Sequence, residues 1–396
     1  MYNVSSYDNL LAIIRSSLWG DRVGTVGQNE YDELKKHSLI GLTANLLPLL
    51  NIQKDLHEKW EKDVYFHLSY SVRYKHEQKR LPISIPYVIL KGTSAAQYYP
   101  CPDLRSMGDI DIMTSHEDYP VACDMLLNNG YKEVTGDHTA DFGRHRCFSK
   151  NGIVVEIHAF FALLNDASKA EWLDNEIIKH INPSHILPDM INGLVLLEHI
   201  DQHMEGGIGL RQIIDWMMFV NKCMDEDAWL QFQELAHKTG LEKLALVTTR
   251  MCEIYLGLKR HNWCKDVDDD ICNQMIDYIL SCGNFGNKHT DDEHARIRVL
   301  TYSRTPFAVL RHIHERGKQN WETAHKYRFL RPFAWVYQIC QYIKKDIKNS
   351  VSKRIIAEYD TAKARISFFD SLGITQASKG YAIYKSGKYI KTYKKP

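Results

Sequence analysis

The chain has 396 residues, longer than one compact core usually allows, and its length favours two or three domains. Its 44% hydrophobic and 25% charged residues, with a net charge of +1, are typical of a soluble globular protein. Residues 1–20 lack a signal-peptide pattern, no stretch has roughly 18 uninterrupted apolar residues, and the nine cysteines include no CxxC pair. These features argue against a secretory leader, a membrane span, a disulfide framework and a zinc knuckle, and they favour a reducing cytoplasm.

Residues 1–82 are predicted to form a helical N-terminal segment. The stretch Ile52–Arg80 contains no Pro or Gly, and its apolar residues recur every four positions, which indicates one long helix. Pro82 and Pro86 then end the helical pattern.

Residues 83–165 have short apolar and alternating stretches, which are typical of strands. A buried strand is predicted over Tyr87–Leu90, and Thr93 or Ser94 is expected to cap a short helix directly after it. A second strand is predicted over Asp109–Met113, where acidic and aliphatic residues alternate.

A helix over residues 116–129 and a β-hairpin complete this segment. The hairpin strands are predicted over Arg146–Ser149 and Ile153–Ile157, because Asn151-Gly152 between them suits a type I′ turn. Residues 83–165 are therefore predicted to be a small sheet-containing core.

Residues 166–315 are predicted to form a helical domain that closes a cleft against this core, with apolar helices over 187–204, 209–221 and 241–258. In residues 316–396, a helix is predicted over 331–348 and a small hairpin over 382–393. The fold class is therefore α+β, with a small mixed β-sheet between a helical N-terminal segment and a larger helical C-terminal region.

The C-terminal segment is strongly basic. Residues 316–396 contain 18 Lys and Arg against 5 Asp and Glu, whereas the rest of the chain contains 32 against 44. Such a tail can contact a polyanion, either nucleic acid or an anionic membrane surface. It can equally be an ordinary solvated face, or dock on the acidic remainder of the chain. We favour these ordinary roles over polyanion binding, and the sequence does not decide whether the tail binds a polyanion.

Three carboxylates in the strand segment could hold metal ions. Asp109 and Asp111 are expected to project from the same face of their strand, where like charges and burial are costly without a counter-charge. A divalent cation supplies that charge, and oxygen-only ligands select a hard ion, Mg²⁺ or Mn²⁺. Glu156, on the second hairpin strand, could join the pair, and a third carboxylate allows two ions to be held.

The turn after the first predicted strand is suited to phosphate. An ammonium, two hydroxyls and the backbone N–H groups of a helix start come together in Lys91-Gly92-Thr93-Ser94. Arg105 could reach the same anion with its forked donors, and Gly108 completes the predicted nucleotide-binding set before the acidic strand.

Each motif is weak by itself, but their order along the chain is specific. It resembles the nucleotidyltransferase superfamily of DNA polymerase β and the aminoglycoside nucleotidyltransferases. More closely, LKGTSAAQYYPCPDLRSMGDIDIM (Leu90–Met113) with VVEIH (Val154–His158) is similar to a bacterial family of largely uncharacterised nucleotidyltransferases. The stretch HIDQHMEGGIGLRQIIDW (His199–Trp216) also looks like that family's second block.

The resemblance implies three metal ligands, namely Asp109, Asp111 and Glu156. It implies that Glu156 also accepts the proton of the attacking group, and that Gly92 with Thr93 or Ser94 forms the phosphate turn. Only Gly92 stands where the wider superfamily usually has Gly-Gly or Gly-Ser, and its gap of 17 residues to the first aspartate is longer than usual there.

Arg211 and Asp215 lie four residues apart within the second block. They are either an intrahelical pair, or Arg211 faces the nucleotide across the cleft while Asp215 holds it in place. His199 and His203 have the spacing of a shared metal site, but no third ligand is evident, and a structural or substrate-contacting role is favoured.

Arg144, His145 and Arg146 approach the hairpin that carries Glu156. They could meet the triphosphate or the acceptor, and exposed strand charges explain them almost as well. The sequence does not distinguish these two roles.

The predicted reaction is transfer of a nucleoside monophosphate from an NTP, by default ATP, to a hydroxyl, with release of pyrophosphate. An amine is a less favoured acceptor, and a small molecule, a sugar, a protein side chain and an RNA end are all compatible. The alternative is a non-catalytic binding or regulatory module, such as a partner of a toxin or of a polysaccharide-assembly system. Kinase-like phosphotransfer is a further alternative, but the P-loop and the kinase H-R-D motif are missing.

Overall fold

The computed structural model describes most of the chain. The described residues are 7–134, 144–164, 166–204, 206–284, His314, Gly317, Trp321, Thr323, 327–347, 363–374, 381–385 and 388–392. The chain divides into two compact units, Met1–Lys288 with Leu372–Pro396, and His289–Ser371. The division into segments at 82, 165 and 315 stays a prediction.

The N-terminal segment is helical. It contains α1 (Asp8–Trp19), α2 (Gln28–Lys36), the 3₁₀ turns η2 (Ile40–Thr43) and η3 (Leu47–Leu49), and α3 (Lys54–Lys79). Helix α3 agrees with the long helix predicted over Ile52–Arg80, and it buries Trp60 and Tyr74 completely.

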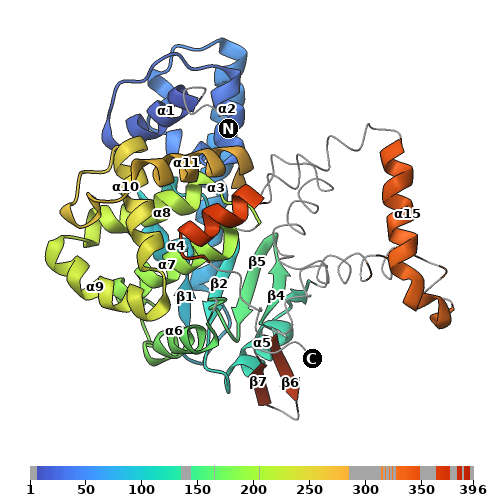
Figure 1. Cartoon of the computed structure of the whole chain (residues 1–396). Coiled ribbons are helices and arrows are strands. Elements are labelled where there is room, and N and C mark those ends of the chain that lie inside the picture. The colour runs from blue at the N-terminus through green and yellow to red at the C-terminus, as the bar shows by residue number, and fades with distance from the viewer. Residues whose placement is uncertain are drawn as a thin grey trace. The chain divides into compact units, whose positions relative to one another are not determined.

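Among the described residues, the first unit has one five-stranded mixed sheet, which confirms the predicted α+β core. Its strands are β1 (Val88–Leu90), β2 (Ile110–Met113), β3 (Lys132–Glu133), β4 (His145–Lys150) and β5 (Ile153–His158). Their order is β1-β2-β5-β4-β3 (Figure 1). Strands β2 and β5 are parallel, whereas the other neighbouring pairs are antiparallel. The predicted hairpin is the β4–β5 pair.

Side chains alternate between the two faces of this sheet. One face is apolar, because Ile110 and Ile112 of β2 and Val155 and Ile157 of β5 belong to a buried cluster with residues of α5 (Tyr119–Asn128). Burial of this face fixes the register, since a slip of one residue would turn the intervening acidic side chains into the core.

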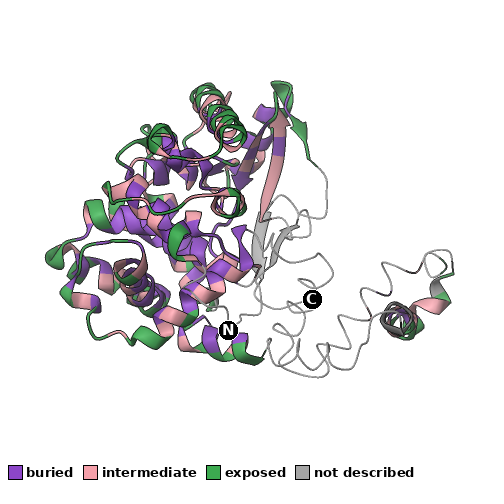
Figure 2. Cartoon of the chain, turned by 90° about the horizontal axis from the view of Figure 1, so that it is seen from above, coloured by how far each residue is buried: buried purple, intermediate pink, exposed green. Residues whose placement is uncertain are grey.

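Helices make up the rest of the first unit before residue 285. Between β1 and β2 the chain forms α4 (Gly92–Ala96) and η4 (Pro102–Leu104). After the sheet follow α6 (Ala167–Lys179), α7 (Asp189–Met204), α8 (Leu210–Cys223), α9 (Glu226–Thr239), α10 (Glu242–Tyr255), η6 (Asn262–Cys264) and α11 (Asp269–Cys282). Figure 2 shows buried residues gathered inside this unit and exposed ones along its outer helix surfaces. Within the described part of the chain, none of the helices combines the length and hydropathy needed to cross a membrane.

The short helix after β1 begins earlier than expected. Neither Thr93 nor Ser94 caps it, since the N-cap is Lys91, without a side-chain cap, and both hydroxyl residues lie inside α4. The backbone causes this difference, because Lys91 and Gly92 have positive φ angles of 51° and 43° and turn the chain before Thr93. Glycine is required at the second position, where a Cβ would overlap the hydroxyl of Tyr74.

The C-terminal part contains the expected helix and hairpin. In the second unit, η8 (Arg328–Phe333) and α15 (Ala334–Ile347) agree with the helix predicted over 331–348. In the first unit, β6 (Tyr381–Lys385) pairs antiparallel with β7 (Lys388–Thr392). The turn of this hairpin lies outside the described residues.

A buried ion pair attaches the loop before β2 to helix α8. The Nε and Nη2 atoms of Arg105 donate to the two carboxylate oxygens of Asp215 at 2.7 and 2.6 Å. Tyr99 Oη donates to the same carboxylate at 2.8 Å. The side chains of the ion pair are only 3% and 1% exposed. Because a buried charge without its partner is strongly destabilising, this pair holds the loop in one position.

We therefore expect Asp215→Asn to lower the free energy of unfolding by about 3–5 kcal/mol, because Arg105 keeps a buried charge without a counter-charge. Urea denaturation measures the loss, with Glu234→Gln on the exposed face of α9 as the control. The double variant Asp215→Asn with Arg105→Met should recover part of the loss. A loss no larger than that of the control would show that the pair does not hold the loop.

Candidate active site

Carboxylates meet on the sheet face opposite the apolar cluster. In the parallel β2–β5 pair, Asp111 is the Cα partner of Glu156, so both side chains project from the same face of neighbouring strands. Asp111 is 1% exposed, and the side chain of Glu156 is 19% exposed. Asp109 directly precedes β2. The structure thus brings Asp111 and Glu156 together as the sequence predicts.

Lys91 supplies a counter-charge to these carboxylates. Its Nζ atom lies 2.6 Å from Oδ1 of Asp111, and its side chain is only 13% exposed. Burial opposes the charged form, but the carboxylates of Asp111, Asp109 and Glu156 outweigh it and raise the pKa of Lys91. The ammonium therefore stays charged and balances part of the negative charge of the site.

Two tyrosines of α3 hold the backbone next to Asp109. Tyr70 Oη donates to the carbonyl of Gly108 at 2.8 Å, and Tyr74 Oη donates to the carbonyl of Asp109 at 2.9 Å. Tyr70 and Tyr74 are one helical turn apart, so they lie on the same face of α3. The long N-terminal helix thereby positions the start of the acidic strand.

The acidity of Glu156 is unusual. Burial and the charges of Asp111 and Asp109 raise its pKa to about 8, although Lys91 and the thiol of Cys147 act in the opposite direction. Without a metal ion, this carboxyl keeps its proton at neutral pH. The acidic set therefore carries more potential negative charge than Lys91 offsets, and this excess fits a bound divalent cation.

His158 links the two strands at the base of the site. Its Nε2 atom lies 2.9 Å from Oδ1 of Asp111 and 3.6 Å from Oε2 of Glu156. Burial and the charges of Lys91 and Arg144 lower the pKa of His158 well below its usual range, so the neutral ring donates from Nε2 to the Asp111 carboxylate. Asp111, Glu156 and His158 offer atoms within 4.8 Å of one another and could share one metal ion.

Cationic side chains gather near the carboxylates. After burial, which is the larger cause, the charges of Lys91, Arg211 and Arg144 help to lower the pKa of His203 to about 3. Arg211 donates from Nη1 to the carbonyl of Ser106 at 3.5 Å, beside the loop before the acidic strand. Such a group of cations suits the negative charge of a triphosphate.

The paired histidines of α7 contact each other. The ring centroids of His199 and His203 are 4.6 Å apart in an edge-on arrangement. Burial lowers the pKa of both, so both rings are neutral. Among the described residues, neither belongs to a group of three metal-binding side chains. Their structural or substrate-contacting role stays a prediction.

The hydroxyls of the predicted phosphate turn bind neighbouring side chains. Thr93 donates to Oε1 of Gln78, and Ser94 donates to Oδ1 of Asn192, each at 2.9 Å. Helix α4 has only five residues, so its dipole is small. The phosphate-binding role of this turn stays a prediction. Of its residues, Lys91 contacts a carboxylate of the site, that of Asp111.

The ion pair of Asp215 adds a partner that the sequence does not predict. The sequence pairs Asp215 with Arg211 and leaves Arg105 for the anion, whereas both oxygens of Asp215 accept from Arg105. Arg105 comes from a loop that is distant in sequence, and its fork matches the carboxylate better than a neighbour on the same helix does. Arg105 and Asp215 thus help to hold the loop before β2, and the nucleotide-binding roles of Arg105, Arg211 and Asp215 stay predictions.

Two residues at the site escaped the sequence analysis, Cys147 and His158. The hairpin pairs Cys147 with Glu156 and His145 with His158. This register could be counted outward from the Asn151-Gly152 turn, because a two-residue loop determines which residues face each other. Strand alternation, counted on both sides of the turn, places His145, Cys147, Glu156 and His158 on one face of the hairpin.

The small mixed sheet thus presents carboxylates from two adjoining strands beside a group of cations. A sequence profile of the family described as uncharacterised nucleotidyltransferase matches residues 37–257, more than half of the chain, and the chain belongs to this family. The match spans the five-stranded sheet and continues through α10. Comparisons with curated proteins and with solved structures gave no match.

The raised pKa of Glu156 predicts how the stability of the metal-free protein depends on pH. Between the ordinary value of 4.5 and about 8, the folded chain keeps a proton that the unfolded chain has lost. Stability from this group is therefore present below pH 4.5 and is lost as pH rises towards 8, by a few kcal/mol at most.

Urea denaturation in the presence of a chelator tests this dependence. Glu156→Gln should match the wild type near pH 5 and be more stable than it near pH 8. The same difference at both pH values would show that Glu156 titrates normally.

Proposed function

We propose that this protein transfers a nucleoside monophosphate from an NTP to a hydroxyl-bearing acceptor and releases pyrophosphate. Asp109, Asp111 and Glu156 would be the catalytic carboxylates. The observation that carries the proposal is the register of β2 and β5, which sets Asp111 beside Glu156 on one face of the sheet. Membership of a nucleotidyltransferase family supports the same reaction class.

The carboxylates would hold one or two divalent ions, Mg²⁺ or Mn²⁺. Their oxygen atoms suit hard ions, and the raised pKa of Glu156 indicates uncompensated negative charge in the metal-free site. When bound, such ions neutralise the triphosphate, lower the pKa of the acceptor hydroxyl and stabilise the departing pyrophosphate. His158 would keep Asp111 oriented through the hydrogen bond that it already donates.

Side chains of the protein would supply the proton acceptor and the phosphate contacts. Glu156 would take the proton of the acceptor hydroxyl. The acceptor oxygen would then form a bond to the α-phosphorus, while the bond from that phosphorus to the bridging oxygen of the β-phosphate breaks and its electrons leave with pyrophosphate. Lys91 and Arg211 would contact the phosphates, since Lys91 lies beside Asp111 and Arg211 lies within reach of the charge of Asp109. Burial lowers the pKa of Arg211, and the carboxylates of Asp215 and Asp109 act in the opposite direction.

A change at Asp109 tests metal binding. Asp109→Asn should weaken Mn²⁺ binding by at least about tenfold, because loss of a direct ligand should cost no less than loss of a group that only holds a ligand in place. Folding should be unchanged or slightly more stable, because one like charge is removed. Calorimetric titration of wild type, Asp109→Asn and the exposed control Asp124→Asn measures the affinity. Equal affinity in all three would remove Asp109 from the metal site.

A change at Glu156 separates an enzyme from a binding module. Glu156→Gln keeps the shape of the side chain but cannot take a proton, so turnover should fall by roughly 10²–10⁴ while NTP affinity stays within a few-fold of wild type. Pyrophosphate release should be followed with each of the four NTPs, with cell extract as the source of acceptor. Glu133→Gln, on the same sheet but paired with Arg146, is the matched control.

The same assay decides between the two functions. Activity that survives Glu156→Gln unchanged would exclude Glu156 as the base. If wild type releases no pyrophosphate under any of these conditions, the chain is better described as a non-catalytic nucleotidyltransferase-fold module.

A further inference from the structure

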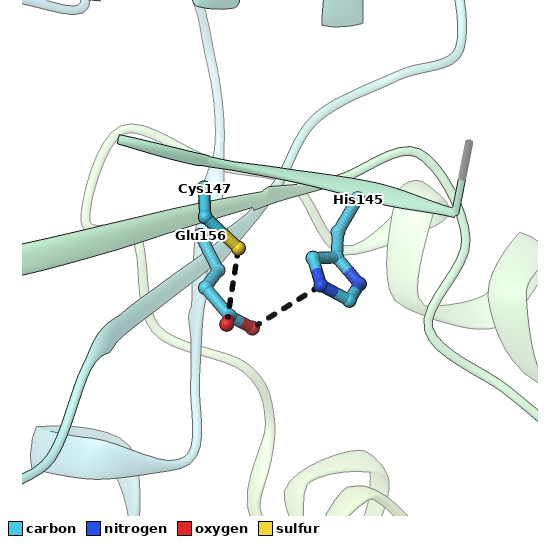
Figure 3. A group of neighbouring side chains, drawn as sticks. All are labelled: His145, Cys147 and Glu156. Carbon is cyan, nitrogen blue, oxygen red and sulfur yellow. Dashed lines mark hydrogen bonds and ion pairs between the residues drawn. The ribbon is translucent and has the colours of Figure 1, made fainter. Parts of the chain in front are cut away.

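A second group of metal-binding side chains lies on the same face of the sheet. His145 and Cys147 lie two residues apart on β4, so their side chains project from the same face, and Cys147 is the Cα partner of Glu156 on β5. Their candidate ligand atoms all lie within 4.8 Å of one another. Figure 3 shows the Glu156 carboxylate reaching both neighbours, with Oε1 3.4 Å from Cys147 Sγ and Oε2 4.0 Å from His145 Nε2.

The donor atoms of this group differ from those of the carboxylate site. A thiol sulfur, an imidazole nitrogen and one carboxylate oxygen make a mixed set, which Mg²⁺ binds poorly and Zn²⁺ binds well. Three protein ligands also leave a fourth tetrahedral position open. None of the three residues is fully buried.

The contacts that join the three side chains are weak. The contact from Cys147 to Glu156 is a hydrogen bond from a weak thiol donor, and the pair with His145 is at the limit of an ion pair. Both contacts would contribute little to stability. Yet the two-residue alternation of β4 and the register of the hairpin direct all three side chains to one point, at which a single ion can replace both weak contacts.

We propose that His145, Cys147 and Glu156 form a binding site for a divalent ion of the Zn²⁺ class. On binding, the S–H bond of Cys147 breaks and its proton goes to solvent, as does the proton that the Glu156 carboxyl holds without a metal ion. Sulfur–metal and oxygen–metal bonds form without change of oxidation state. The site itself does not depend on nucleotidyl transfer. If the proposed function holds, the shared Glu156 makes Zn²⁺ an inhibitor, because the ion withdraws that carboxylate from the Asp111 side.

Cobalt substitution tests the site with the full-length chain under reducing conditions. Co²⁺ should saturate at about one ion per chain and give a thiolate-to-metal charge-transfer band, and Zn²⁺ should displace it. Cys147→Ser should abolish the band, and His145→Gln should weaken binding by at least about tenfold. Cys101→Ser removes an exposed cysteine elsewhere on the chain and should change neither.

Two further measurements distinguish loss of the metal site from misfolding of a variant. Calorimetric Zn²⁺ titrations in two buffers of different ionisation enthalpy count released protons, and wild type should release about one more than Cys147→Ser. Circular dichroism should show the same fold in all variants. An unchanged Co²⁺ band in Cys147→Ser, or a band lost in Cys101→Ser, would overturn the site. Zn²⁺ binding by a chain that releases no pyrophosphate would overturn the proposed function alone.

Discussion

Asp111 is buried on a sheet face, where a carboxylate without partners would be strongly destabilising. The ammonium of Lys91 at 2.6 Å and the imidazole of His158 at 2.9 Å compensate for this burial. The parallel pairing of β2 with β5 then brings a further carboxyl, Glu156, to the same place. Since Lys91 cannot neutralise every acid, the site is left with a demand for positive charge. A bound divalent cation would answer that demand.

The elements around the sheet serve to hold this arrangement in position. Tyrosines of α3 bind the carbonyl groups of Gly108 and Asp109, and the ion pair of Arg105 with Asp215 attaches the same loop to α8. These contacts are short and directional, and the ion pair is buried. A site supported in this way loses little conformational freedom when a substrate binds, which favours both affinity and turnover.

Glu156 connects two kinds of ligand chemistry. On one side it faces Asp111, an oxygen ligand suited to Mg²⁺, and on the other it faces Cys147 and His145, which suit Zn²⁺. One carboxylate cannot serve both ions fully. The identity of the bound ion would therefore depend on which metals are available as well as on the affinity of each site, and it would decide whether Glu156 is free to take part in proton transfer.

The sequence alone determined the elements and their order. The period of the apolar residues predicted α3, and the Asn-Gly turn with its flanking alternation predicted the hairpin that carries Glu156, because both signals are local. The tertiary structure decided which charged groups meet. The positive φ angles at Lys91 and Gly92 accompany the pairing of Lys91 with Asp111. The contact between α8 and the loop before β2 pairs Arg105 with Asp215. Such pairings join residues that are distant in the chain, so no local pattern encodes them.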